Sequence, residues 1–420
     1  MNHDTSKALH VSRSAVALVA LLALLPWLAI FLLLDREAPA PTAPAAFRAP
    51  APVRTAATIP GRPGPWGDLA ITRVLIEPPE SLLPLPSAIA APHVWTIRGM
   101  SSEQLRLWFE RIPLSPELRT AVANPTRWEV RGDTIVIRPG DDVVAALTPE
   151  ARSRIYTLLS EFPENSAQNA PFRFRADVAD EWFRDSDLEP RTIELVKKFL
   201  YQRGTSLLFS DTNLVLPRIS TQAERMRLIK TLSRKSTLMV QLRLHPDSDV
   251  EALAAYWGRG QRSRDIAPLL RSLQPKEGVA TIDLIHLLPR MPRQLLYTYP
   301  LPNEKGSDSF MDCHWTSLNF FNLHPEPLYE DIAALQQSFA SDYFLLTSKP
   351  TFGDILLFTR PDNSVIHSCV YLADDIVYTK NGAQPNAPWI LMALSDVIAY
   401  YPSEKPIEIQ CYRAKRLAPP

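Results

Sequence analysis

Cys313 and His367 are the two residues whose types and positions best fit nucleophilic chemistry. Cys313 stands in Asp312-Cys313-His314-Trp315, directly before an apolar run that is typical of a helix. A thiol at the start of a helix meets the positive end of the helix dipole and free backbone N–H groups, and both favour the thiolate. His367 stands in an apolar run that is typical of a strand, from which an imidazole can pair with the thiol. We therefore predict a lowered pKa at Cys313 and a nucleophile–base pair.

Several segments must position this pair. Residues 311–321 suit a helix whose first turn carries Cys313. Runs of apolar residues predict strands downstream, at 355–358, 365–372, 376–380 and 407–412. One helix against an antiparallel sheet is an α+β arrangement, which is the fold class predicted for this part of the chain. The segment 385–401 fits no element of this pattern.

Three short motifs follow one another in this region, namely Asp312-Cys313, then Gly353-Asp354-Ile355, then His367 with Val370-Tyr371-Leu372. In this order they resemble the papain-like cell-wall cysteine peptidases of the NlpC type. The resemblance covers residues 296–420 and implies Cys313 as the nucleophile and His367 as the general base. It also implies a tyrosine in the cleft, which Tyr299 matches, and a polar third residue that orients the imidazole.

The third residue is expected on the strand that follows His367. Strand alternation puts Val377, Thr379 and Asn381 on one face of that strand. Asn381 and Thr379 can each accept a hydrogen bond from an imidazole N–H. Asn381 is the preferred candidate.

Two positions depart from the family pattern. His314-Trp315 stands where the family has Ser-Gly after the nucleophile, and Cys369 stands where it has Gly beside the base. Both departures add bulk near the cleft, which argues against the family's usual substrate. The residues expected to contact substrate are Tyr299, His314 and Trp315. Cys369 lies on the same strand face as the base, where it can line the cleft or form a disulfide with Cys411.

The resemblance implies a cysteine hydrolase that cleaves amide bonds, in particular those of peptidoglycan stem peptides, and that needs no metal or organic cofactor. Two alternatives stay open. One is a non-catalytic papain-like envelope module that binds a partner or a wall polymer. The other is an acyl or amide transferase.

Composition excludes several other classes of protein. The chain has 45 basic and 45 acidic residues, so no bulk charge attracts nucleic acid. It contains no His-Glu-x-x-His or Gly-x-Ser-x-Gly motif, which argues against zinc proteases and serine hydrolases. Three cysteines are too few for a disulfide scaffold or a structural zinc site.

An uncharged apolar run at 15–34 predicts one transmembrane helix, since at about 1.5 Å per residue it spans roughly 30 Å. Lys7 and Arg13 precede it, which predicts a cytoplasmic segment 1–14 and an extracytoplasmic remainder. The expected location is the inner (cytoplasmic) membrane, with a single pass and the bulk of the chain on the periplasmic side. A cleaved signal peptide is the alternative.

Two further parts are predicted between the membrane span and the cysteine region. Residues 35–66 are rich in Ala and Pro and suit an extended linker. Residues 67–295 suit a mixed α/β domain of unknown role, with a hairpin at 128–137, helices near 190–203, 221–232 and 249–257, and a strand at 237–244. Arg259, Arg262 and Arg264 are expected to form a solvated basic cluster in a loop.

Overall fold

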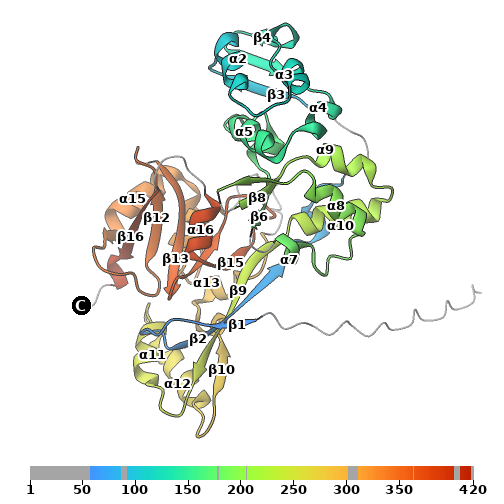
Figure 1. Cartoon of the computed structure of the whole chain (residues 1–420). Helices are drawn as coiled ribbons and strands as arrows, with labels where there is room; N and C mark the ends of the chain where they lie inside the picture. Colours follow the sequence, from blue (N-terminus) through green and yellow to red (C-terminus); the bar gives the residue numbers. More distant parts are fainter. Residues whose placement is uncertain are drawn as a thin grey trace, which may run out of the picture. The chain divides into compact units, whose positions relative to one another are not determined.

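Antiparallel sheets connected by short helices make up the described part of the chain, so the structure is of the mixed α+β kind (Figure 1). This computed structural model describes residues 57–86, 92–176, 179–204, 206–300, 311–362, 364–401 and 407–417. The predicted membrane span at 15–34 and the segment 1–14 lie outside these residues. Within the described ranges, no helix has the length and apolarity needed to cross a membrane.

A six-stranded antiparallel sheet carries the candidate site. In spatial order its strands are β11 (Tyr343–Leu345), β16 (Glu408–Ala414), β12 (Ile355–Thr359), β13 (Val365–Ala373), β14 (Ile376–Lys380) and β15 (Trp389–Ala393). Every residue of β12 is buried, in keeping with its continuous apolar run. His367 pairs with Phe358 while Val365 pairs with Thr359, so Ile366 is an extra residue that forms a bulge at the start of β13.

Hydrophobic cores lie on both faces of this sheet. The helices in this part of the chain are α13 (Arg290–Leu295), α14 (Cys313–Leu318), α15 (Ile332–Asp342) and α16 (Leu394–Tyr400). On one face, Trp315 of α14 packs in the same core as Val370. On the other face, Val397 of α16 packs in the same core as Cys369. Alternate residues of β13 therefore point into two different cores.

A four-stranded antiparallel sheet shares the first of these cores. Its strands are, in spatial order, β1 (Thr58–Pro60), β2 (Asp68–Ile76), β9 (Lys235–Leu244) and β10 (Ala280–Asp283), with helices α11 (Val250–Trp257) and α12 (Ser263–Leu273) following β9. Leu242 and Trp257 belong to the same core as Trp389 of β15. Thr237 Oγ1 donates to the carbonyl of Leu391 at 3.0 Å and accepts from its N–H at 3.1 Å. The predicted boundary at 295/296 therefore crosses a continuous core.

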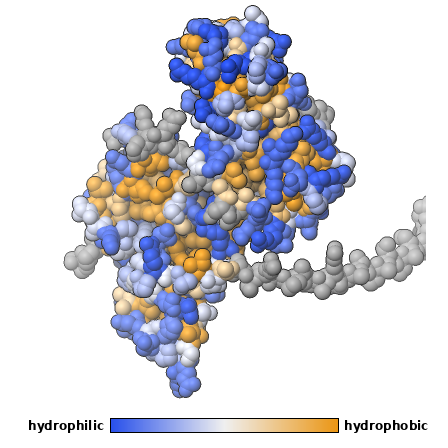
Figure 2. All heavy atoms as spheres, viewed as in Figure 1, coloured by the Kyte–Doolittle hydropathy of each residue, from blue (hydrophilic) through white to orange (hydrophobic). Residues whose placement is uncertain are grey.

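A separate core is built from residues between 83 and 232. Its strands form two antiparallel sheets, β3 (Trp95–Arg98), β5 (Thr134–Ile137) and β4 (Glu129–Arg131), and β6 (Phe172–Arg175), β8 (Ser206–Phe209) and β7 (Tyr201–Arg203). Its helices are α2 (Ser102–Glu110), α3 (Pro116–Val122), α4 (Asp141–Ala146), α5 (Pro149–Leu159), α6 (Ser166–Asn169), α7 (Ala179–Phe183), α8 (Pro190–Lys197), α9 (Thr212–Val215) and α10 (Gln222–Leu232). In Figure 2 hydrophilic residues cover much of the surface near α2 and α3, as expected for helices with one buried face.

Most of the predicted elements are confirmed, with ends shifted by a few residues. The helix expected at 311–321 is shorter, because α14 ends at Leu318. The helix expected at 190–203 ends at Lys197, and Tyr201–Arg203 forms β7. The unassigned segment 385–401 contains β15 and α16. The linker predicted to run to residue 66 is also wrong at its end, because Thr58–Pro60 pairs with β2 as an edge strand, where proline is tolerated.

The arginines after α11 do not form a solvated cluster, contrary to the prediction for Arg259 and Arg262. Arg262 Nη2 donates to the carbonyls of Leu287 and Leu288 at 2.7 and 2.9 Å. Arg259 Nη1 donates to the carbonyl of Phe352 at 2.6 Å. These backbone carbonyls lie far from the arginines in the sequence, so sequence proximity alone did not reveal the contacts.

Asp354, the acid of the Gly-Asp motif, is a structural residue that is 0% exposed. Arg413 of β16 donates to both carboxylate oxygens, at 2.8 and 2.6 Å, and Arg259 lies 3.5 Å from Oδ1. Gly353 has a φ of +89°, and a Cβ there would lie 2.3 Å from the Phe321 ring. Only glycine fits that position. The motif thus fixes the start of β12, which pairs with β13.

We predict that Asp354→Asn lowers the free energy of unfolding by about 3–5 kcal/mol, because it removes the buried charge that pairs with two half-buried arginines. Urea denaturation of the full chain measures this. Asp247→Asn makes the same chemical change at an exposed turn and should stay within about 0.5 kcal/mol of the wild type. If Asp354→Asn is as mild as Asp247→Asn, the arginines do not depend on this carboxylate.

Candidate active site

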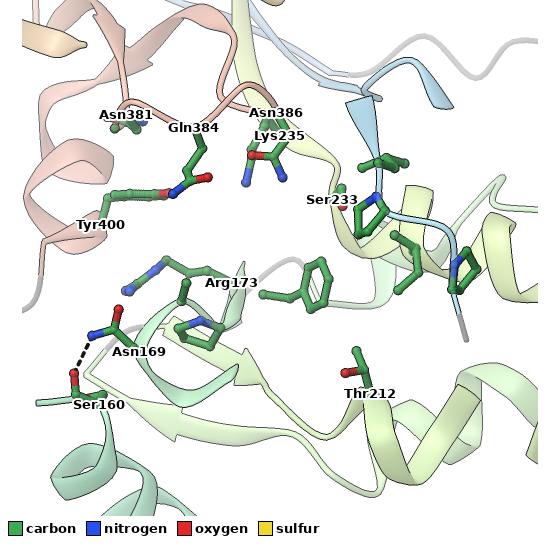
Figure 3. A pocket seen from close by; sticks show the side chains of 18 of the residues that line it. Ser160, Asn169, Arg173, Thr212, Ser233, Lys235, Asn381, Gln384, Asn386 and Tyr400 are labelled. Atoms are coloured by element: carbon green, nitrogen blue, oxygen red, sulfur yellow. Dashed lines mark hydrogen bonds between the residues drawn. The ribbon is translucent and has the colours of Figure 1, made fainter. Parts of the chain in front are cut away.

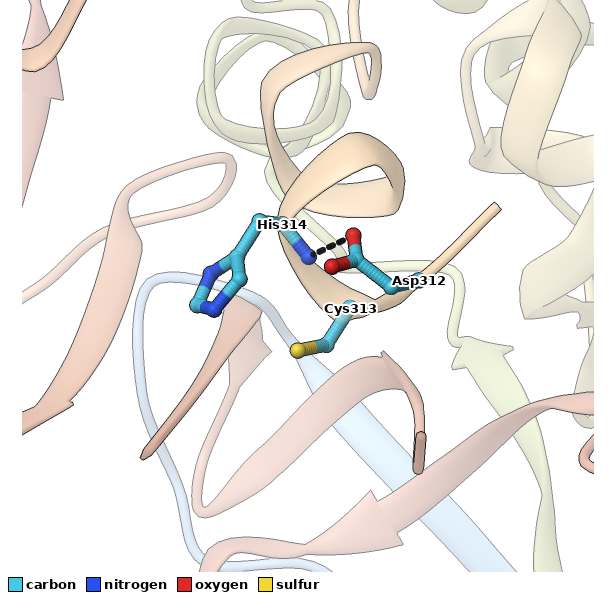
Figure 4. A group of neighbouring side chains, drawn as sticks. All are labelled: Asp312, Cys313 and His314. Atoms are coloured by element: carbon cyan, nitrogen blue, oxygen red, sulfur yellow. Dashed lines mark hydrogen bonds between the residues drawn. The ribbon is translucent and has the colours of Figure 1, made fainter. Parts of the chain in front are cut away.

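Cys313 is the first residue of α14, and the side chain of Asp312 caps this helix. Asp312 Oδ1 accepts hydrogen bonds from the backbone N–H groups of His314 and Trp315, at 2.9 and 2.8 Å. Figure 4 shows Sγ of Cys313 directed away from the helix, with the His314 ring and the Asp312 carboxylate to either side. Cys313 is only 6% exposed, and α14 packs on β13 and β14.

The predicted lowering of the Cys313 pKa is wrong. Burial, and secondly the negative charge of Asp312, raise the pKa of this thiol to about 12. Backbone hydrogen bonds, including one from Ser368, act in the opposite direction but have a smaller effect. Desolvation therefore outweighs the short dipole of a six-residue helix. In this conformation the thiol is protonated at neutral pH.

His367 is fully buried in β13 and is held by a chain of hydrogen bonds along β14. Its Nε2 lies 3.0 Å from Thr379 Oγ1, which donates to Asn381 Oδ1 at 3.3 Å. Asn381 Nδ2 in turn donates to Sδ of Met392 at 3.0 Å. A hydroxyl can donate only one hydrogen bond, and Thr379 donates its bond to Asn381. The Thr379 oxygen therefore accepts a hydrogen bond from the ring N–H of His367. This assigns the proton of the neutral imidazole to Nε2.

The other ring nitrogen of His367, Nδ1, is buried and has no hydrogen-bond partner within the described part of the chain. Tyr401 stacks on the ring with centroids 4.5 Å apart, and Phe358 packs against it in a T-shaped arrangement at 5.4 Å. Burial, and secondly the nearby His314, lower the pKa of His367 to about 3. The imidazole is therefore neutral at physiological pH, with a lone pair on Nδ1.

No hydrogen bond joins Cys313 to His367, because Nε2 binds Thr379 and Nδ1 has no partner among the residues described. The next residue, Ser368, faces α14 instead. Its Oγ donates to the Cys313 carbonyl at 3.2 Å and lies 2.9 Å from His314 Nδ1. Since successive side chains of a strand alternate, His367 points to the other side of β13. The predicted pair is therefore not assembled, because α14 and the imidazole lie on opposite faces of β13.

The predicted substrate-binding residues lie in three different surroundings. Trp315 is 4% exposed and packs in the hydrophobic core, so it lines no open cleft in this conformation. His314 is half-buried and bound to Ser368. Tyr299 is half-buried, and burial and then the charge of Glu77 raise its pKa. No described group forms a hydrogen bond with the Tyr299 hydroxyl.

Sequence reasoning ranked one contact of His367 second and missed another. Thr379, rather than Asn381, touches the imidazole, and Asn381 acts on it through Thr379. Alternation along β14 allowed both residues, and only the pairing register decides between them. Tyr401 was missed because it ends the segment that fitted no predicted element. The apolar alternation of Trp389–Ala393 is the signal that could have located β15 and the helix after it.

Asp312, Cys313 and His314 are the one group of described residues with ligand atoms close enough for a metal ion, within 4.8 Å of one another. Oδ1 of Asp312 and Nδ1 of His314 already form hydrogen bonds, and the thiol is protonated. The group is therefore poorly prepared for a metal, which binds thiolate rather than thiol. Cys369 and Cys411 are both free, so the alternative of a disulfide between them is not realised.

Comparison with protein-family models, with curated proteins and with solved structures finds no match in any of the three. The resemblance to NlpC-type peptidases therefore rests on the sequence motifs alone.

We predict that iodoacetamide at pH 8 labels Cys411 at least about tenfold faster than Cys313 or Cys369, because Cys411 is the only half-buried thiol of the three. Peptide mapping by mass spectrometry gives the three rates, and labelling in urea should make them similar. The opposite order, with Cys313 fastest and slowed by His367→Ala, would mean that a preformed thiolate–imidazolium pair exists in solution.

The low pKa of His367 predicts a loss of stability in acid. The unfolded chain takes up a proton near pH 6.5, whereas the native imidazole stays neutral down to about pH 3. The contribution is therefore complete above pH 6.5 and is lost as the pH falls, by about 2 kcal/mol between pH 6.5 and 5. Urea denaturation should show a smaller loss for His367→Asn, while His324→Asn, at an exposed histidine, keeps the wild-type pH dependence. Equal losses for both variants would contradict the assignment.

Proposed function

We propose that the C-terminal part of this chain is a papain-like cysteine hydrolase of the cell envelope, held in a resting state in the conformation described. The observation that carries the proposal is the state of His367. Its Nε2 is oriented by Thr379, and its Nδ1 has a free lone pair. A base that a third group orients through one nitrogen, with the other nitrogen available, is the arrangement that a nucleophilic thiol requires.

The proposed reaction follows from these two residues. Nδ1 of His367 takes the proton of the Cys313 thiol as Sγ attacks an amide carbonyl. The imidazolium then gives this proton to the leaving amine, and water hydrolyses the thioester. Backbone N–H groups at the start of α14 are candidates to stabilise the oxyanion. No step calls on a metal or an organic cofactor.

Activity requires a change at the site, because both pKa values oppose a preformed ion pair and the two side chains are not bonded. The bulge at Ile366, directly before His367, is a feature that supports such a change, since bulges locally re-aim side chains. The ring of Tyr401 stacks on the imidazole and covers one of its faces. Activity would require the His367 side chain to turn to the face of β13 on which α14 lies.

The expected substrate and location belong to the same proposal. We take peptidoglycan stem peptides as the substrate class, on the strength of the motif resemblance. The uncharged run at 15–34 supports an anchor in the inner membrane, with the described residues on the periplasmic side.

A second candidate, a papain-like module that binds wall peptides without cleaving them, is favoured by one specific observation. The Cys313 thiol is buried and protonated rather than exposed and ionised. A structural cysteine has these properties, whereas reactive cysteines lie in partly exposed, electropositive surroundings.

We predict that the purified full chain releases amines from cell-wall peptides and that Cys313→Ser and His367→Ala each lower the rate by about a thousandfold or more, since each removes an essential group. Thr379→Ala should cost about 10–100-fold, because the imidazole loses its orientation, and Asn381→Ala less. Cys411→Ser serves as the matched control and keeps the wild-type rate.

Cleavage that survives Cys313→Ser would refute the proposed mechanism. If the wild type binds the peptides but never cleaves them under any condition, the binding module is the correct function. A thioester trapped from an amine acceptor, with transfer faster than hydrolysis, would instead identify a transferase.

A further inference from the structure

A cavity of about 860 Å³ lies beside the candidate site and contains none of the residues proposed for the chemistry except Asn381. Its walls come from β6, α9, the start of β9 and the segments around β14 and α16. Tyr401, which stacks on His367, forms part of its lining. This volume is in the range of sites that hold a small molecule or a short peptide.

The charge of this cavity is strongly one-sided. Four basic residues line it, Arg173, Arg203, Lys235 and Arg360, and no Asp or Glu does. None of the four has an ion-pair partner within the described ranges. An adjoining cavity of about 750 Å³ shares Arg173 and Lys235 and contains one acid, Asp396. That acid is already neutralised by ion pairs with Arg73, at 2.9 Å, and with a second arginine.

Two of the arginines carry N–H groups that lack an acceptor. Arg173 Nη1 and Arg203 Nε are buried and have no hydrogen-bond partner among the residues described. Arg173 stacks on Tyr400 at 5.1 Å, and Figure 3 shows its side chain projecting into the space between Tyr400 and Asn169. Burial, together with the nearby Arg203, lowers the pKa of Arg173.

Buried donors of charged groups are normally satisfied, because leaving them without an acceptor costs free energy. Here two such groups lie in one cavity that has room for a ligand. An anionic ligand in the cavity would balance the positive charge of the two guanidinium groups that line it, and a guanidinium binds a carboxylate through two parallel hydrogen bonds.

The rest of the lining indicates the body of the ligand. Five carboxamide side chains face the cavity, those of Asn169, Asn213, Asn381, Gln384 and Asn386. Carboxamides both donate and accept, so they match the N–H and C=O groups of a peptide backbone. The rest of the lining includes prolines, leucines and isoleucines, which suit small apolar side chains, and a few hydroxyl residues.

We propose that this cavity binds a short peptide with a free carboxylate, and that Arg173 and Arg203 hold the carboxylate. The site is separate from the proposed hydrolysis, since neither arginine takes part in that chemistry. It would give the chain an affinity for acidic peptides even if Cys313 is not a nucleophile.

The test uses calorimetric titration of the full chain at constant ionic strength. The probes are N-acetyl-trialanine, its C-terminal amide and inorganic phosphate. The free acid should bind at least about tenfold more tightly than the amide, because only the acid carries a negative charge that can pair with the arginines. Arg173→Gln should weaken binding of the acid by about 10–100-fold, the usual size of a charge-assisted contact.

Arg131→Gln is the matched control, because it removes the same charge from an exposed hairpin and should leave binding unchanged. If Arg173→Gln does not fold, Arg203→Gln takes its place in the comparison. Equal binding of acid and amide, or wild-type binding by the cavity variant, would overturn the proposal. Binding of phosphate alone would overturn the assignment of a peptide carboxylate, and so would an absence of binding by all three probes. Repeating the titration with Cys313→Ser separates this outcome from any failure of the proposed hydrolysis.

Discussion

The buried carboxylate of Asp354 is the interaction on which the C-terminal architecture depends. Its two arginines come from the loop between α11 and α12 and from β16, so one charge joins that loop, a strand inside the six-stranded sheet and the start of β12. β12 fixes the register of β13, and β13 carries both His367 and Ser368. Because an unpaired buried charge is so unfavourable, all three segments are fixed together. The Gly-Asp motif thus acts on the site through the scaffold rather than through contact with substrate.

Desolvation governs the electrostatics of the candidate site. It raises the pKa of Cys313 and lowers that of His367, so both side chains are neutral at physiological pH. A thiolate–imidazolium pair would need both to be charged. The same burial shields the hydrogen bond between His367 and Thr379 from competing water. The scaffold therefore orients the base while it leaves the nucleophile protected. In the described conformation the two side chains therefore do not form an ion pair.

The cationic cavity gives a reason for a connection between ligand binding and the candidate site. Tyr401 lies between them, with its ring on His367 and its other side in the cavity lining. Asn381 belongs to both the cavity and the candidate site, because it lines the cavity and accepts a hydrogen bond from Thr379. A ligand that shifts either residue would change how the imidazole is held. The two proposals are independent in their evidence, yet the residues between the sites provide a physical route from one to the other.

The sequence by itself determined the elements that carry the site, because their signals are local. Periodicity located β12, β13 and β14 to within a residue or two, and the order of the Cys, Gly-Asp and His motifs indicated one helix against an antiparallel sheet. Tertiary structure alone decided the chemistry of the residues on those elements. The dipole argument for Cys313 failed because burial depends on how α14 packs against the sheet, which no local pattern reports. Thr379 displaced Asn381 as the partner of His367 because the register of β13 and β14, with its irregularity near Tyr371, sets which side chain reaches the ring. The basic cavity was invisible in the sequence, since Arg173 and Lys235 meet only when segments far apart along the chain fold together.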